Sequence, residues 1–151
     1  MYPGILRLNW WHEEELGKLE KNKIVLHYLD GKLLKGFTWD FFPNKDHFHF
    51  FTMENTSDTP VKVSVKELKA IFTVRDFNGN PQYKERREFL EGEVVTGTKL
   101  EATFTDGEVM VGTTLGYSPK RQGFYIFPAD PKSNNIKVYA SCSAVAKVRY
   151  L

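Results

Sequence analysis

Hydrophobic and polar residues alternate with a period of two along much of this chain. In the segment 61–65, for example, Val61, Val63 and Val65 alternate with Lys62 and Ser64. This pattern is typical of a β-strand that buries one face. On the same basis we predict strands over residues 24–29, 33–42, 48–51, 61–65 and 68–74, and a second set over 99–105, 108–116, 123–127, 136–142 and 145–150. The sequence therefore predicts an all-β protein.

Glycines mark the turns and bends between these strands. Asp30-Gly31 and Asp106-Gly107 each follow the first strand of a set. An Asp-Gly pair favours a tight hairpin, because glycine adopts positive φ without a steric penalty. Gly36 and Gly112 fall inside the second strands, where a glycine indicates a bend or a close approach of another backbone.

The two sets of strands are repeats of one pattern. Lys23–Phe51 aligns without a gap on Lys99–Phe127, so that the Asp-Gly turns and the internal glycines coincide. After one inserted residue the alignment continues, with Val61 on Val138 and Leu68 on Val145. We interpret this as an internal duplication. It predicts two tandem five-stranded small barrels, in which a bent second strand serves both faces.

Two segments outside the strands have a helical pattern. Residues 11–19 precede the first unit, and Gln82–Leu90 lies between Pro81 and Gly92, which is common punctuation of a helix. We therefore expect an all-β fold with one or two short helices. The predicted organisation is an N-terminal helical segment (1–22), a first barrel (23–76), a linker with a helix (77–98) and a second barrel (99–151).

Composition limits the classes of function. The 151 residues are 41% hydrophobic and 15% aromatic, which suits one packed unit of ordinary size. The net charge of +2 excludes a strongly basic protein that binds nucleic acid mainly through charge. Cys142 is the one cysteine, so no internal disulfide forms. Without an apolar run of membrane length or a secretory leader, we expect a cytoplasmic protein and no membrane partner.

The repeated unit resembles the Sm-like fold, and other SH3-like barrels share its motif. The residues that carry the resemblance are Val25–Gly36 and Glu101–Gly112, each an alternating strand, an Asp-Gly hairpin and a glycine within the next strand. The resemblance implies RNA binding and assembly through the fourth and fifth strands, which here would join the two units internally. The turns Lys66-Glu67 and Ser143-Ala144 lack the glycine of the Sm RNA site. Nucleic acid is therefore the alternative partner and not the leading one.

The chain also resembles a family of small bacterial proteins to which no activity is assigned. The similar segments are 40–44, 74–77, 116–119 and 127–131, of which 40–44 reads Asp-Phe-Phe-Pro-Asn. This resemblance implies no substrate and no catalytic residue.

No residue pattern indicates catalysis. His47 and His49 share one face of a strand, where two imidazoles could bind zinc, but the pattern offers no third ligand and we interpret them as a solvated face. Cys142 aligns with the core position Val65, which indicates an inert buried thiol. We therefore expect no enzyme, and no catalytic, cofactor or metal site.

The loops are the candidate binding sites, because binding groups commonly lie on loops held by a rigid scaffold. The candidate ligand-binding residues are polar or aromatic residues of three loops: Arg75, Asp76, Tyr117, Ser118, Lys120, Arg121, Asp130 and Asn134. The leading hypothesis is a non-enzymatic binding module for a protein or small-molecule partner. The alternative is an Sm-like RNA-binding protein, in which aromatic and basic side chains near Tyr117 and Arg149 would stack on and pair with single-stranded RNA.

Overall fold

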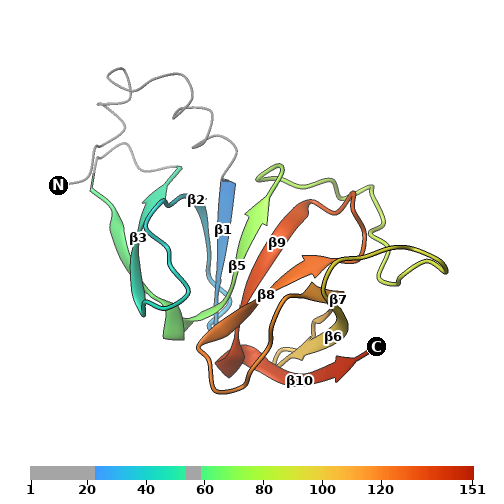
Figure 1. The fold of residues 1–151 in the computed structure, drawn as a ribbon. Helices are drawn as coiled ribbons and strands as arrows, with labels where there is room; N and C mark the ends of the chain where they lie inside the picture. The colour runs from blue at the N-terminus through green and yellow to red at the C-terminus, as the bar shows by residue number, and fades with distance from the viewer. Residues whose placement is uncertain (1–22, 54–58) are drawn as a thin grey trace.

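Ten antiparallel strands form one sheet in the computed structural model, which describes residues 23–53 and 59–151 (Figure 1). The order across the sheet is β10-β6-β7-β8-β9-β5-β1-β2-β3-β4. The bounds are β1 Lys23–Tyr28, β2 Leu33–Phe37, β3 His47–Thr52, β4 Val61–Ser64, β5 Leu68–Val74, β6 Thr98–Phe104, β7 Val109–Thr114, β8 Gly123–Pro128, β9 Asn135–Ser141 and β10 Val145–Tyr150. The prediction of an all-β fold is confirmed, with each strand close to its predicted position.

Strand β2 is shorter than predicted, since it ends at Phe37 and not at residue 42. Side chains then replace the backbone ladder between β2 and β3. Thr38 Oγ1 donates a hydrogen bond to the carbonyl oxygen of His49 at 2.8 Å, and the Asp40 carboxylate accepts one from the His49 N–H at 2.9 Å. Because these side chains satisfy the backbone of β3, the chain is free to leave the sheet as a loop.

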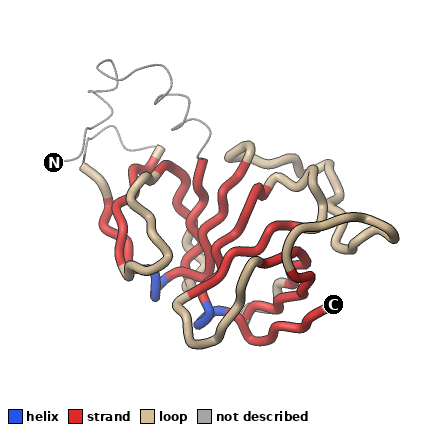
Figure 2. Tube along the Cα trace, viewed as in Figure 1, coloured by secondary structure: helices blue, strands red, loops and turns tan. Residues whose placement is uncertain are grey.

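Helix is confined to two short 3₁₀ turns in the described residues, η2 Val65–Glu67 and η3 Cys142–Ala144 (Figure 2). Each joins the fourth strand of a half to the fifth. The helix predicted over 82–90 is wrong, because this segment is an irregular loop. The helix predicted over 11–19 lies outside the described residues. No helix of the described chain is long and apolar enough to cross a membrane.

The two internal glycines occupy matching positions. Gly36 lies between Ile24 and Thr52, and Gly112 lies between Leu100 and Pro128, so each middle strand pairs with both neighbours at its glycine. A Cβ atom on Gly36 would lie 2.0 Å from the carbonyl oxygen of Phe51, and one on Gly112 would lie 2.2 Å from that of Phe127. The predicted close approach of backbones is therefore confirmed at both glycines.

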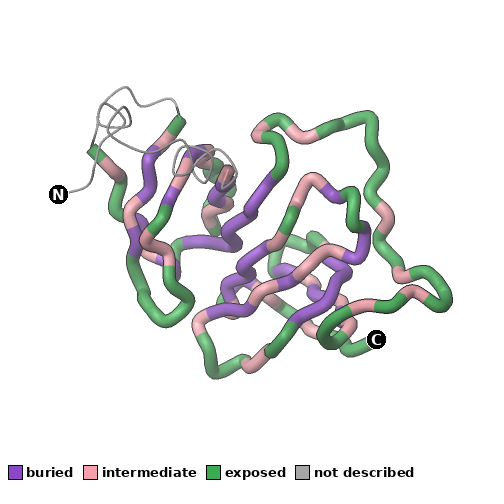
Figure 3. Tube along the Cα trace, turned by 45° about the horizontal axis from the view of Figure 1, so that its top comes forward, coloured by how far each residue is buried: buried purple, intermediate pink, exposed green. Residues whose placement is uncertain are grey.

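The two halves meet where β5 pairs with β9, the fifth strand of the first half with the fourth strand of the second. This is the internal joint that the sequence predicts. Buried residues continue across it without a break (Figure 3). Val25, Ala70, Phe72 and Val74 of the first half belong to the hydrophobic core of the second. The second core is therefore complete only when the first half is present.

Candidate functional site

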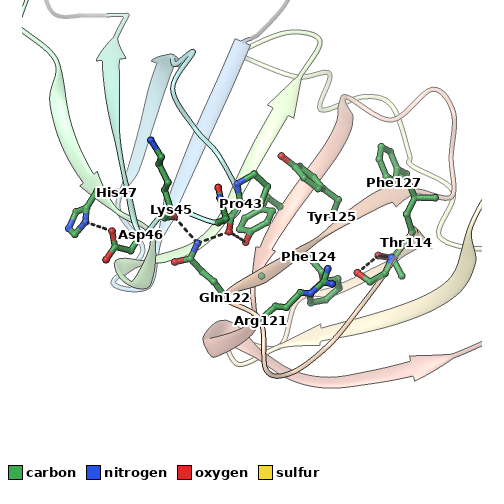
Figure 4. Close-up of a pocket in the computed structure, with 15 residues that line it drawn as sticks. Pro43, Lys45, Asp46, His47, Thr114, Arg121, Gln122, Phe124, Tyr125 and Phe127 are labelled. Carbon is green, nitrogen blue, oxygen red and sulfur yellow. Dashed lines mark hydrogen bonds and ion pairs between the residues drawn. The ribbon is translucent and has the colours of Figure 1, made fainter. Parts of the chain in front are cut away.

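A groove of about 1110 Å³ lies between the two halves (Figure 4). One wall is the loop that leads into β3, from Pro43 to His47. The other wall comes from the second half, with residues 114–116 on one side and Arg121 and Gln122 on the other. Both walls thus belong to the connections between the second and third strands of their halves.

Strand β8 forms the floor of the groove. Its residues alternate, so that Phe124 and Ile126 are buried in the core while Tyr125 and Phe127 are half-buried beside the groove. The rings of Tyr125 and Phe127 have centroids 6.4 Å apart. Tyr139 of β9 packs edge-on against Tyr125 at 5.1 Å. Burial raises the pKa of Tyr125 and of Tyr139 above that of an ordinary phenol.

Hydrogen bonds across the groove hold its walls at a set distance. The Gln122 side-chain amide donates to the carbonyl oxygens of Pro43 at 3.2 Å and of Lys45 at 2.9 Å (Figure 4). Tyr139 Oη also lies 3.5 Å from the Pro43 carbonyl oxygen. Because one donor group binds two carbonyl oxygens of the opposite wall, the groove is shaped before any ligand binds.

Each wall presents one basic side chain, Lys45 from the first half and Arg121 from the second. Both are exposed, and neither forms an ion pair with a carboxylate among the described residues. The nearby Asp46 is held by His47, whose hydrogen bond lowers the pKa of that carboxyl. The Lys45 ammonium lies over the Phe42 ring, 5.4 Å from its centroid. The groove therefore combines an aromatic floor with two cations that could pair with an anionic group.

Four of the predicted binding residues lie on the loop that forms the second wall. Arg121 lines the groove. Tyr117 instead packs against Phe124 with ring centroids 4.7 Å apart, and Ser118 holds the turn by accepting a hydrogen bond from the Lys120 N–H at 3.3 Å. Lys120 is exposed beside Arg121 and does not line the groove.

The other four predicted residues lie away from the groove and tie loops together. Arg75 donates to the carbonyl oxygens of Ser133 and Pro131 at 3.0 and 3.1 Å. The Asn134 side chain joins the same two loops by binding the backbone of Asp76. Its Oδ1 accepts a hydrogen bond from the Asp76 N–H at 3.0 Å, and its Nδ2 donates one to the Asp76 carbonyl oxygen at 2.9 Å.

Asp130 is buried and accepts hydrogen bonds from Tyr83 Oη and from the Arg86 N–H. The Tyr83 hydrogen bond is the main reason that the pKa of Asp130 is lowered. This contact also explains why 82–90 is not helical, since the Arg86 N–H is bound to a residue far along the chain.

The histidines and the cysteine have local partners. His49 Nδ1 lies 2.8 Å from Asp40 Oδ2, and His47 Nδ1 lies 2.8 Å from Asp46 Oδ1. Within 23–53 and 59–151, no three potential metal ligands gather at one point. Cys142 is only partly buried, and burial raises the pKa of its thiol, which disfavours the reactive thiolate.

Sequence reasoning did not select Lys45, Tyr125, Phe127 or Tyr139 as site residues. A signal for one of them was present in the repeat, because Lys45 aligns with the selected Arg121. Tyr139 reaches the groove only because β9 pairs with β5, and no local pattern reports that contact.

A family model matches residues 20–151 of this chain, which is most of its length and includes every residue of the groove. The chain belongs to DUF6982, a family of unknown function. No curated protein and no solved structure matches it significantly. The DUF6982 match runs through both halves and the loop between them, so the groove lies within the family's own sequence and not at its margin.

Proposed function

We propose that this protein is a non-enzymatic binding module whose ligand lies in the groove between its halves. The convergence of two matching loops above a half-buried aromatic floor is the observation that carries this proposal. Large aromatic side chains with a few placed polar groups are what ligand sites commonly offer. The ligand is a small molecule or a segment of a protein, with an anionic group between Lys45 and Arg121.

We also propose that the halves are duplicated Sm-like units, each a small barrel. The shared strand order and the matching contacts of Gly36 and Gly112 support this. Duplication explains the groove's two cations, because Lys45 and Arg121 occupy the same place in the repeat. The binding site would then arise where the two units join, because a loop of the first unit lies beside β8, the third strand of the second unit.

Small aromatic carboxylates are suitable first probes, because they carry one flat apolar group and one charge. Amide chemical shifts of ¹⁵N-labelled protein should move for residues 44–47 and 121–127 when such compounds are titrated. The double variant Lys45→Gln with Arg121→Gln should weaken binding about thirtyfold, since each of the two charge-assisted contacts contributes on the order of 1 kcal/mol.

Lys147→Gln with Lys62→Gln is the matched control, because both lysines are exposed and neither lines the groove. It removes the same charge and should leave binding unchanged. Chemical-shift changes confined to other surfaces would contradict the assignment of the groove as the binding site. Equal weakening of ligand binding in the double variant and in its control would contradict it too.

RNA binding is the second candidate, and the two cations beside Tyr125 favour it. A base stacked on that ring with phosphates near Lys45 and Arg121 would bind in a salt-dependent manner. We expect little binding of single-stranded oligonucleotides at physiological salt, because two cations neutralise few phosphates. An electrophoretic shift of mixed oligonucleotides that disappears in Lys120→Ala with Arg121→Ala would favour the RNA-binding function instead.

A further inference from the structure

A second hollow of about 400 Å³, here called the recess, adjoins the groove. Leu115 and Phe127 line both hollows, so the two are neighbours that share these side chains. The lining of the recess is mainly apolar, with Val94, Val95, Pro128 and Pro131 among its residues. Its one acidic residue, Glu93, is paired with Arg86 at 3.2 Å. The recess is therefore a place for an apolar group and offers no free charge of its own among the described residues.

The rim of the recess exposes two aliphatic side chains. Val94 is 97% exposed and Leu115 is 75% exposed. The loop that carries Val94 is held by Arg86, which binds both carboxylate oxygens of Glu93 and the carbonyl oxygen of Ala129. Val94 is therefore held in water by a fastened loop, and Leu115 lies on the separate loop that follows β7. Both also line the recess, so they extend its apolar lining to the protein surface, where a contiguous apolar patch marks an interaction site.

We propose that the groove and the recess together bind one extended peptide segment of a partner protein, with an acidic side chain for the groove and an aliphatic or aromatic one for the recess. The proposal rests on the proposed function and names its partner. Charge complementarity carries it, because the groove is lined by two cations without acidic partners in the described chain and by one carboxylate, Asp46, which is hydrogen-bonded to His47, while the adjoining recess is apolar. A small ligand would fill one hollow only.

A peptide fits this pair of hollows better than RNA does. Alternate side chains of an extended peptide lie on the same side and would enter neighbouring hollows in turn. The recess has aliphatic and proline walls but no cation for a phosphate, so a nucleic acid chain continuing from the groove would find no counter-charge there.

Selection of displayed random twelve-residue peptides against the full chain tests the proposal. The enriched peptides should combine Asp or Glu with a large apolar residue two or more positions away. Their fluorescein-labelled forms should bind the Val94→Asp and Leu115→Asp variants at least tenfold more weakly than the wild type. The double variant Lys45→Gln with Arg121→Gln should also bind them at least tenfold more weakly. Leu29→Asp is the control, since Leu29 is 51% exposed but lies in the first hairpin and lines neither hollow.

The outcomes separate this inference from the proposed function. If the groove variant weakens binding and the recess variants do not, the groove stands and the recess assignment is overturned. If aromatic carboxylates bind the groove but no peptide is enriched, the groove stands as a binding site and only the peptide partner is overturned. If peptides bind equally to all variants, both proposals fail. Displacement of bound peptide by single-stranded RNA at physiological salt would replace the peptide with nucleic acid as the partner.

Discussion

Lys69 of β5 and Asp106 of the β6–β7 turn form an ion pair across the joint between the halves, with Nζ and Oδ2 2.7 Å apart. Glu108 of the same turn accepts a second hydrogen bond from Lys69. The Lys69 side chain is only 11% exposed, whereas those of its two partners are about half exposed. Burial alone would lower the pKa of Lys69, but the hydrogen bonds to the two carboxylates outweigh it and raise that pKa.

Removing both carboxylates should destabilise the protein. Asp106→Asn with Glu108→Gln leaves the Lys69 cation buried without a counter-charge, which we expect to cost about 1–3 kcal/mol of unfolding free energy at neutral pH. Chemical denaturation measures this. Glu101→Gln is the control, because it breaks the more exposed Arg149–Glu101 pair and should cost no more than about 1 kcal/mol.

The same ion pair predicts how stability depends on pH. The hydrogen bond from Lys69 is the main cause that lowers the pKa of Asp106 in the folded protein. The ionised Asp106 carboxylate therefore stabilises the folded protein fully above its unfolded pKa of about 4. This stabilisation is lost as the pH falls through the lowered pKa of the folded state. Thermal melting of wild type and Asp106→Asn should converge under acid conditions. A constant difference from pH 7 to below pH 3 would contradict the assignment.

A methyl group at Gly36 should destabilise the fold. The Cβ atom of Gly36→Ala would overlap the Phe51 carbonyl oxygen, so β2 and β3 must separate. We expect a loss of roughly 1–3 kcal/mol, the range for backbone strain at a constrained site. Gly116→Ala is the matched control, because nothing lies within 4 Å of its added Cβ atom. Equal stability of the two variants would mean that the close approach at Gly36 is not rigid.

The second half should not fold alone. A chain of residues 98–151 lacks Val25, Ala70 and Phe72, which complete its core, and it exposes the β9 edge. We expect no cooperative melting transition by circular dichroism. Mixing with a chain of residues 1–97 should restore the transition, because the missing core residues return with β5. A cooperative transition for 98–151 by itself would refute the shared core.

The outer strand β10 should resist pairing with another copy. Residues Lys147 and Arg149 stand where the repeat places Ala70 and Phe72 in β5, which are buried against β9. Charged side chains on an edge strand oppose pairing, because it would bury them without partners. Lys147→Ala with Arg149→Phe should therefore self-associate with rising concentration in sedimentation velocity experiments.

Lys147→Gln with Arg149→Gln separates loss of charge from gain of apolar surface. This control removes both charges without rebuilding the apolar face of β5, and we expect it to sediment as the wild type does. The assignment of β10 as a protected edge would be wrong if the Ala/Phe variant also sedimented as the wild type.

The positions of the strands and hairpins were readable from the sequence because they depend on local patterns. Alternation over 61–65 predicts that Val63 and Val65 face the core, as they do, although Val61 at the start of the strand is exposed. The Asp-Gly pairs indicate where the chain reverses. The constrained positions of Gly36 and Gly112 were also predictable, since a glycine inside a strand indicates that another backbone comes close. The repeat further indicated that the two halves share one order of strands.

Contacts between distant residues decided the rest. Gln82–Leu90 has the punctuation of a helix, but Asp130 and Glu93 bind Arg86 and hold the segment as a loop. These hydrogen bonds outweigh its helical propensity, because so short a helix is only marginally stable by itself. Arg75 and Asn134, which the sequence predicts as ligand-binding residues, form hydrogen bonds to backbone carbonyls of other loops, and no pattern along the chain indicates these contacts. The groove exists because pairing of β5 with β9 brings Lys45 and Arg121 to opposite walls, and no pattern along the chain determines a distance between residues so far apart.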